Sequence, residues 1–138
     1  MIKAFRVHHL GVAVGDFEKA VAFYSQVLGF QVLSGPFDDP IQKVRLGFLG
    51  AVADGALVIE IICPLDHSSP VNGYLAKEIG AYHVCYEVAD LESALGELRN
   101  KGCLVISKPV PAVAFGGRLI AWCFTPTKQL IELLEEAS

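Results

Sequence analysis

The chain has 138 residues, of which 53% are hydrophobic and 19% charged, and its formal net charge is −4. So much apolar material excludes a disordered chain, and the length fits one compact domain or two small fused modules. A net negative charge disfavours nucleic acid as a partner, because phosphate binding needs a basic face. No signal core and no apolar run long enough to span a bilayer are present, so we expect a cytoplasmic protein without membrane attachment.

The first half predicts a strand, a helix and three further strands. The first strand starts at His9 and continues through the apolar residues 10–14. Asp16 is a good helix N-cap, and Gly29 marks the end of that helix. Strands are then predicted at residues 30–34, 42–49 and 56–63. One stripe at helical spacing should face the core: Phe17, Ala20, Val21, Tyr24 and Leu28.

The second half repeats this order. Residues 65–80 read as a linker, because Pro and Gly precede a short helix-like stretch. A strand starts at His83, Asp90 caps a helix and Gly102 ends it. Strands are predicted at 103–107, 118–124 and 129–135, while residues 109–117 are either a mobile flap or an ordinary connection. The apolar stripe of this helix is Leu91, Ala94, Leu95 and Leu98.

An internal duplication accounts for the repeated order. A shift of 74 positions places His9 on His83, and a shift of 72 places Glu60 on Glu132. One shortened loop would produce this difference in offset. We therefore predict an α+β fold of two tandem βαβββ modules, residues 5–64 and 81–135. The modules should pack as a single domain, 1–138, since each alone is too small to cover its sheet face.

Four polar residues interrupt otherwise apolar strands, and the repeat pairs them. Taken singly, a histidine at a strand start is usually structural, and a glutamate in a strand usually faces solvent. Taken together, His9, Glu60, His83 and Glu132 form a set of two imidazoles and two carboxylates that suits a divalent first-row ion. The sequence does not distinguish among Zn, Co, Ni, Mn, Fe and Mg as the ion that this set would bind.

Other polar residues carry weaker signals. His8 points to the opposite strand face from His9 and should be exposed or lie behind the ligands. Arg118 follows a Gly-Gly pair that lets a loop approach a ligand, and Lys43 and Arg45, like Lys108, could steer a phosphate or carboxylate; a solvated strand edge is the alternative. The four cysteines form no C-x-x-C pair, so we expect reduced thiols.

The chain resembles the vicinal oxygen chelate superfamily, which includes glyoxalases, bleomycin resistance proteins and dioxygenases, over nearly its whole length. The similarity lies in HLGVAV and EKAVAFY, in HVCYEV and DLESAL, and in the paired strands IEII and IELL. Within the superfamily it is most similar to methylmalonyl-CoA epimerases, through ALVIEIICPL, SPVNGYLAKEIGAYHVCYEV, GGRLIAW and LIELLE.

The resemblance implies a metal-dependent epimerase, isomerase or lyase that moves a proton next to a carbonyl. It implies a metal held by His9, Glu60, His83 and Glu132, with Glu132 or Glu60 as the catalytic base. It also implies mixed sheets that curl around a cleft, a small substrate such as a CoA thioester, and a homodimer. The candidate substrate contacts are Arg118, Lys43 and Arg45, which the residues themselves single out. One departure is the stretch 42–46, which has no carboxylate where epimerases can carry an extra acid.

Three other activities stay open at this point. One is a glyoxalase I-type lyase acting on a thiol conjugate, and another is a non-catalytic small-molecule binding or resistance protein of the same fold. A ring-cleaving iron oxygenase is the third, although such enzymes usually use two histidines and one carboxylate.

Overall fold

The computed structural model describes residues 5–51 and 57–138. It divides into two compact units, whose boundary falls within the first and the fifth strand. We call His9–Tyr82 the N-terminal unit, and His83–Ser138 with the chain up to His8 the C-terminal unit. Within the described residues, no helix combines the length and the apolar character needed to cross a bilayer.

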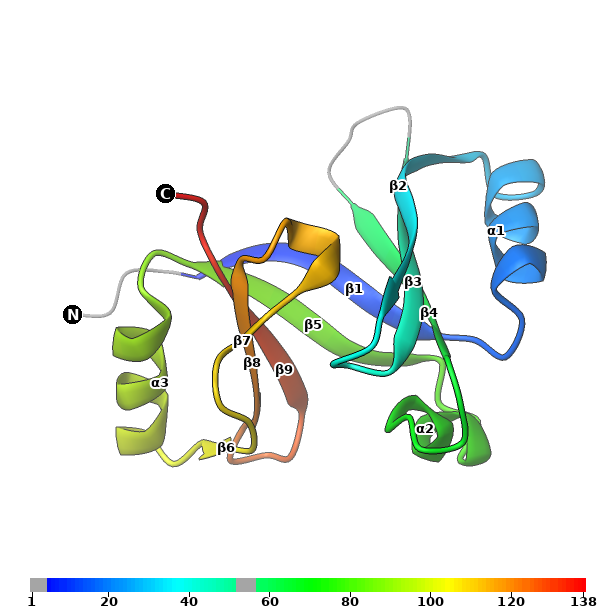
Figure 1. The fold of residues 1–138 in the computed structure, drawn as a ribbon. Helices are drawn as coiled ribbons and strands as arrows, with labels where there is room; N and C mark the ends of the chain where they lie inside the picture. Colours follow the sequence, from blue (N-terminus) through cyan, green and yellow to red (C-terminus); the bar gives the residue numbers. More distant parts are fainter. Residues whose placement is uncertain (1–4, 52–56) are drawn as a thin grey trace. The chain divides into compact units, whose positions relative to one another are not determined.

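The described residues of the N-terminal unit form four strands and two helices (Figure 1). Its sheet has the order β2-β3-β4-β1, in which β1 runs parallel to β4 and the other pairs are antiparallel. The elements are β1 (Arg6–Ala13), α1 (Phe17–Gln26), β2 (Phe30–Asp39), β3 (Val44–Ala51), β4 (Val58–Pro64) and α2 (Val71–Ala76).

The C-terminal unit repeats this topology. Its sheet has the order β5-β9-β8-β6, with β5 parallel to β9, and the short β7 also pairs with β8. The elements are β5 (Ala81–Val88), α3 (Leu91–Asn100), β6 (Leu104–Val105), β7 (Val110–Pro111), the 3-10 turn η1 (Val113–Phe115), β8 (Leu119–Phe124) and β9 (Leu130–Glu135). The predicted α+β fold of two βαβββ modules is confirmed; their packing as one domain stays a prediction.

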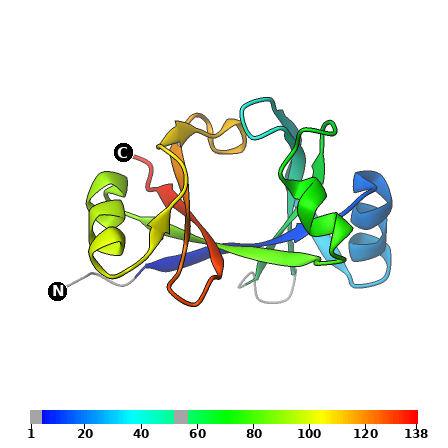
Figure 2. The ribbon, with the colours of Figure 1, turned by 90° about the horizontal axis from the view of Figure 1, so that it is seen from below.

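Each unit packs one helix on one face of its own sheet (Figure 2). In the N-terminal unit, Phe17 of α1 packs with Ile59 and Ile61 of β4. In the C-terminal unit, Leu91 and Leu95 of α3 pack with core residues of β8 and β9. Apolar residues at helical spacing thus bury the helix faces that the sequence predicts, and the opposite sheet faces are left for other side chains.

Aspartate caps begin both long helices, as predicted. The Asp16 carboxylate accepts a hydrogen bond from the Lys19 amide at 3.0 Å, and Asp90 accepts from the Ser93 amide at 3.2 Å. Gly29 and Gly102 follow the helices with φ of 76° and 93°, a region in which glycine avoids the steric cost of a side chain.

The structure differs from the predicted elements at several positions. The strand predicted at 42–49 is β3, which begins two residues later, and residue 56, where the next strand is predicted to begin, lies outside the described residues. Leu28 does not belong to the buried stripe, since α1 ends before it and the residue is half exposed. The strand predicted at 30–34 extends to Asp39, because a bulge around Gly35 lets the pairing with β3 continue. The strand predicted at 103–107 shrinks to two residues, β6, since the Ser107 hydroxyl accepts the hydrogen bond of the Trp122 amide in place of a backbone partner.

Leu95 tests the core of the C-terminal unit. It is fully buried, so Leu95→Ala is expected to lower the free energy of unfolding by about 3 kcal/mol in urea titrations. Leu104→Ala is the matched control, because Leu104 is 64% exposed and a surface truncation typically changes stability by about 0.5 kcal/mol or less. Equal losses in the two variants would contradict this assignment of the core.

The pH dependence of stability provides a second test of this core, because the Cys123 thiol is buried in it. Burial, together with the neighbouring Cys103 thiol, raises the pKa of Cys123 from 9.0 to about 11. Between these values the folded chain binds more protons than the unfolded chain, so stability is complete below pH 9 and falls as pH rises toward 11. The loss is about 2–3 kcal/mol. Unfolding titrations across this range should show a shallower decline for Cys123→Ala, and parallel curves would refute the assignment.

Candidate functional site

The C-terminal unit buries a histidine beside a glutamate on the sheet face that α3 does not cover. The parallel pairing sets Cys85 of β5 opposite Glu132 of β9, so His83 lies two residues before the paired position on the same face. His83 Nε2 is 3.3 Å from Glu132 Oε1, and both residues are 3% exposed. The Trp122 ring meets the imidazole edge-on, with 4.8 Å between ring centroids.

The N-terminal unit contains the equivalent pair. Gly11 of β1 is paired with Glu60 of β4, and His9 again lies two residues before the paired position. His9 Nε2 is 3.5 Å from Glu60 Oε1, and the residues are 0% and 4% exposed. The ring of Phe48 contacts the His9 imidazole at 5.2 Å between centroids.

The aromatic residues are part of the repeat, and the sequence analysis missed them. Phe48 is paired with Glu60 on β3, and Trp122 is paired with Glu132 on β8. The shift of 74 that relates the histidines also places Phe48 on Trp122. Each unit therefore has a histidine, a glutamate and an aromatic ring at corresponding sheet positions, so the repeat preserves a local site as well as a fold.

The chemistry of each pair fits a metal ligand set. A carboxylate buried from water needs a cation or hydrogen-bond donors close by, and an imidazole nitrogen can donate to it or share a metal ion with it. Two atoms that bind one ion at about 2.1 Å each lie about 3 Å apart, close to the observed 3.3 and 3.5 Å. Each unit can thus supply one nitrogen and one oxygen ligand.

Lys43 and Arg45, predicted as substrate contacts, lie at other places in the N-terminal unit. Lys43 is exposed in the turn before β3, with φ of 61°. Arg45 is paired with Cys63, on the α1 side of the sheet, while Glu60 faces the other side. Its guanidinium makes two hydrogen bonds to Asp38, at 2.8 and 3.1 Å, and holds the pKa of that carboxyl below its usual value. A substrate role for either residue stays a prediction.

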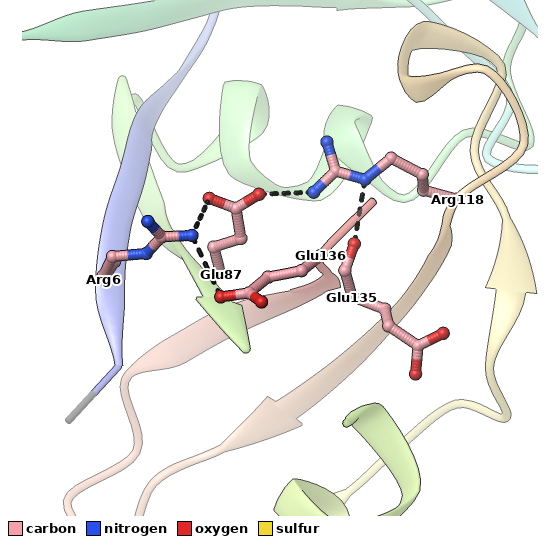
Figure 3. A network of polar contacts seen from close by, with 5 residues as sticks. All are labelled: Arg6, Glu87, Arg118, Glu135 and Glu136. Carbon is pink, nitrogen blue, oxygen red and sulfur yellow. Dashed lines mark hydrogen bonds and ion pairs between the residues drawn. The ribbon is translucent and has the colours of Figure 1, made fainter. Parts of the chain in front are cut away.

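Arg118, the third predicted contact, lies in an ionic network of the C-terminal unit (Figure 3). Its guanidinium donates to the Glu87 carboxylate and, at 2.9 Å, to the carbonyl oxygen of Glu135. Arg6 of β1 donates to Glu87 at 3.1 Å and to Glu136 at 3.0 Å. Two guanidinium groups therefore converge on the single carboxylate of Glu87.

Residues 109–117, left open between a flap and a connection, form an ordered hairpin. Val110 and Pro111 of β7 pair with β8, and the Ala112 amide donates to the Arg118 carbonyl at 3.0 Å. Phe115 packs beside Cys85, Ile120 and Leu134 on the sheet face that carries His83. His8 is half-buried against the Phe115 ring, 5.2 Å between centroids.

Comparisons with known proteins identify related chains. The model of the Glyoxalase/Bleomycin resistance protein/Dioxygenase superfamily matches residues 8–122. The ethylmalonyl-CoA/methylmalonyl-CoA epimerase of Cereibacter sphaeroides is 34% identical over 115 residues, which are 82% of this chain and 83% of that protein. The lactoylglutathione lyase of Escherichia coli O157:H7 is 32% identical over 133 residues, covering 95% of this chain and 93% of that protein.

A solved structure extends the similarity to three dimensions. A variant of the Streptomyces coelicolor methylmalonyl-CoA epimerase, in complex with 2-nitronate-propionyl-CoA, superposes with a TM-score of 0.81 and 28% identity. The match covers 99% of this chain and all of that one. The chain is therefore similar to both epimerases and lyases.

Trp122 provides a direct test of the His83–Glu132 pair. It is the single tryptophan of the chain, and its ring contacts His83. Titration with Co²⁺, a paramagnetic ion, is expected to quench its fluorescence with saturation near one equivalent. His83→Ala should abolish the saturable quenching, because an imidazole ligand is lost, whereas His67→Ala, at an exposed position, should retain it. Quenching that is unaffected by His83→Ala would count against the pair as a metal ligand.

Proposed function

The chain belongs to the Glyoxalase/Bleomycin resistance protein/Dioxygenase superfamily, and on this premise we propose that it is a metal-dependent enzyme that moves a proton next to a carbonyl. The preferred reaction is epimerisation of an acyl-CoA thioester, as in a methylmalonyl-CoA epimerase. The observation that carries the proposal is the buried His–Glu pair at the same register in each unit.

We propose that His9, Glu60, His83 and Glu132 together hold one divalent ion. The support is the donor set, two imidazoles and two carboxylates, which neutralises a divalent charge and suits first-row ions. When bound, such an ion would stabilise the negative charge that develops on a substrate carbonyl oxygen as the neighbouring carbon loses its proton. Four protein ligands leave positions for substrate oxygens if the ion is five- or six-coordinate.

The glutamates supply the proton transfer in this proposal. Glu132 or Glu60, whichever would not bind the ion during turnover, takes the proton from the carbon next to the carbonyl and returns it, on the other face for an epimerisation. Both carboxylates are almost completely buried, and such a site keeps bulk water away from the carbanion-like species. The rings of Trp122 and Phe48 contact the two imidazoles and restrict their orientation.

The side chains around Glu60 provide an argument about which substrate the site would accept. Val44, Leu46 and Phe48 are the β3 residues on the Glu60 side of the sheet, and all three are apolar and buried. The extra acid that epimerases can carry on this strand therefore has no counterpart on that face of β3. This difference weakens methylmalonyl-CoA itself as the substrate and leaves room for a related acyl or keto compound. Arg118 is the proposed contact for an anionic part of the substrate, and homodimerisation stays a prediction.

A glyoxalase I-type lyase is the second candidate. It is favoured by the similarity to the lactoylglutathione lyase of Escherichia coli O157:H7, which extends over 95% of the chain. The same buried carboxylates would move a proton between neighbouring carbons of a hemithioacetal formed from a thiol and a 2-oxoaldehyde. The two candidates share the metal set and differ in the thiol that the site accepts.

Proton exchange in deuterated water tests the proposed function. The metal-loaded protein is expected to introduce deuterium next to the carbonyl of an acyl-CoA thioester, measured by mass spectrometry or NMR. Chelation should stop the exchange, and Glu132→Gln or Glu60→Gln should slow it at least about 100-fold, the lower range for loss of a general base. His67→Ala should leave the rate unchanged.

The substrates separate the candidates. Exchange with thioesters supports the epimerase, and conversion of a hemithioacetal without thioester exchange supports the lyase. If metal binds but neither substrate class reacts, a non-catalytic binding protein of the same fold replaces the enzyme proposal.

A further inference from the structure

We propose that Arg6 and Arg118 form a binding site for the phosphate groups of the CoA moiety, and that the Glu87 carboxylate occupies this site in the absence of ligand. The identity of the ligand rests on the proposed function. The site itself rests on the geometry of the ionic network in the C-terminal unit (Figure 3).

The network has the geometry of an anion site. Arg6 Nη2 approaches one oxygen of Glu87, at 3.1 Å, and Arg118 Nη2 approaches the other oxygen. Two guanidinium groups directed at one anion are typical of phosphate recognition, because each is planar, permanently charged and carries several donors. Glu87 thus marks the position that an incoming phosphate would take.

Arg118 is held in place for such a ligand. Its Nε donates to the Glu135 carbonyl oxygen at 2.9 Å, and its guanidinium carbon lies 5.9 Å from the centre of the Phe115 ring. The side chain remains 25% exposed. Since these contacts do not involve Glu87, the guanidinium keeps its orientation when Glu87 turns away, and less entropy is lost on binding.

The carboxylates of Glu87 and Glu136 can move away from the two arginines. The side chains of Glu87 and Glu136 are 20% and 37% exposed, so each can rotate into water and retain hydration of its charge. The Glu135 carboxylate is engaged elsewhere, since it accepts the hydrogen bond of the Leu91 amide at 2.9 Å. A doubly charged phosphate can therefore displace a singly charged carboxylate between the two arginines.

The site lies on the same sheet face as the His83–Glu132 pair. Glu87 follows His83 by four residues on β5, an even separation that keeps both side chains on one face, about 13 Å apart along the strand. Apolar residues and the β7–β8 hairpin lie between them, with Cys85, Ala112, Ile120 and Leu134 buried there. A ligand that reaches both groups, with a carbonyl at one end and phosphates at the other, therefore passes over this packed cluster and not through it.

Binding measured by calorimetry tests the site without requiring catalysis. The probes are CoA, which carries the phosphates, and pantetheine, which lacks them. Arg118→Lys and Arg6→Gln are each expected to weaken CoA binding about tenfold, the loss of one charge-assisted interaction. Glu87→Gln should tighten CoA binding at least about threefold, because it removes a charge that competes with the phosphate. Binding of pantetheine should not change in any of the three.

A control variant and a second readout keep the test decisive. Arg99→Gln removes an exposed arginine of the same unit and should leave the Kd of CoA unchanged, while inorganic pyrophosphate should raise the melting temperature of Glu87→Gln more than that of the parent chain. An unchanged Kd for CoA in Arg6→Gln and Arg118→Lys, weaker binding in Glu87→Gln, or equal effects on CoA and pantetheine would overturn the proposal. These experiments measure binding and thermal stability, and no turnover. They therefore test the phosphate site even if the enzymatic assays fail.

Discussion

The parallel pairing between the first and last strands of each module is the constraint on which the site depends. It places Gly11 opposite Glu60 and Cys85 opposite Glu132, so that each histidine, two residues earlier, meets its glutamate at 3.3 or 3.5 Å. A slip by one residue would turn every side chain of a strand to the other face. Because helices α1 and α3 bury the alternate residues, such a slip would also expose the core.

The two faces of each sheet therefore have separate tasks. The helix-covered faces contain the large apolar clusters that stabilise the units. The opposite faces hold the His–Glu pairs with their aromatic neighbours. Side chains on these faces, such as Val44 and Leu46 near Glu60, can vary without disturbing the helix packing. This separation explains how epimerases and lyases can share one scaffold.

The sequence predicted most of the elements and the two buried His–Glu pairs, because these depend on local signals and on the repeat; the buried Asp39 and Ser69 were not predicted. Helix caps, helical stripes and the paired offsets of 74 and 72 are all readable along the chain. The position of Arg45 was not readable in this way. Both faces of β3 are apolar, as in Val44, Leu46 and Leu49, so alternation does not indicate which face carries the arginine.

The partners of Arg118 also escaped prediction, for a different reason. Arg6, Glu87 and Glu135 come from three strands that are distant in the sequence, and their contacts depend on long-range register. The lengths of β2 and β6 depend on a bulge and on one side-chain hydrogen bond, respectively. Such features are decided by tertiary pairing, which a single sequence does not reveal.

The bulge in β2 also has a consequence for solubility. β2 is the outermost strand of its sheet, spans ten residues and leaves Val32 and Leu33 more than half exposed. A long, regular margin of this kind is a template for edge-to-edge polymerisation. The irregular pairing around Gly35, and Pro36, which has no amide hydrogen to donate, interrupt that template. The protein can therefore keep an apolar, strand-forming margin in water without offering the continuous ladder from which fibrils grow.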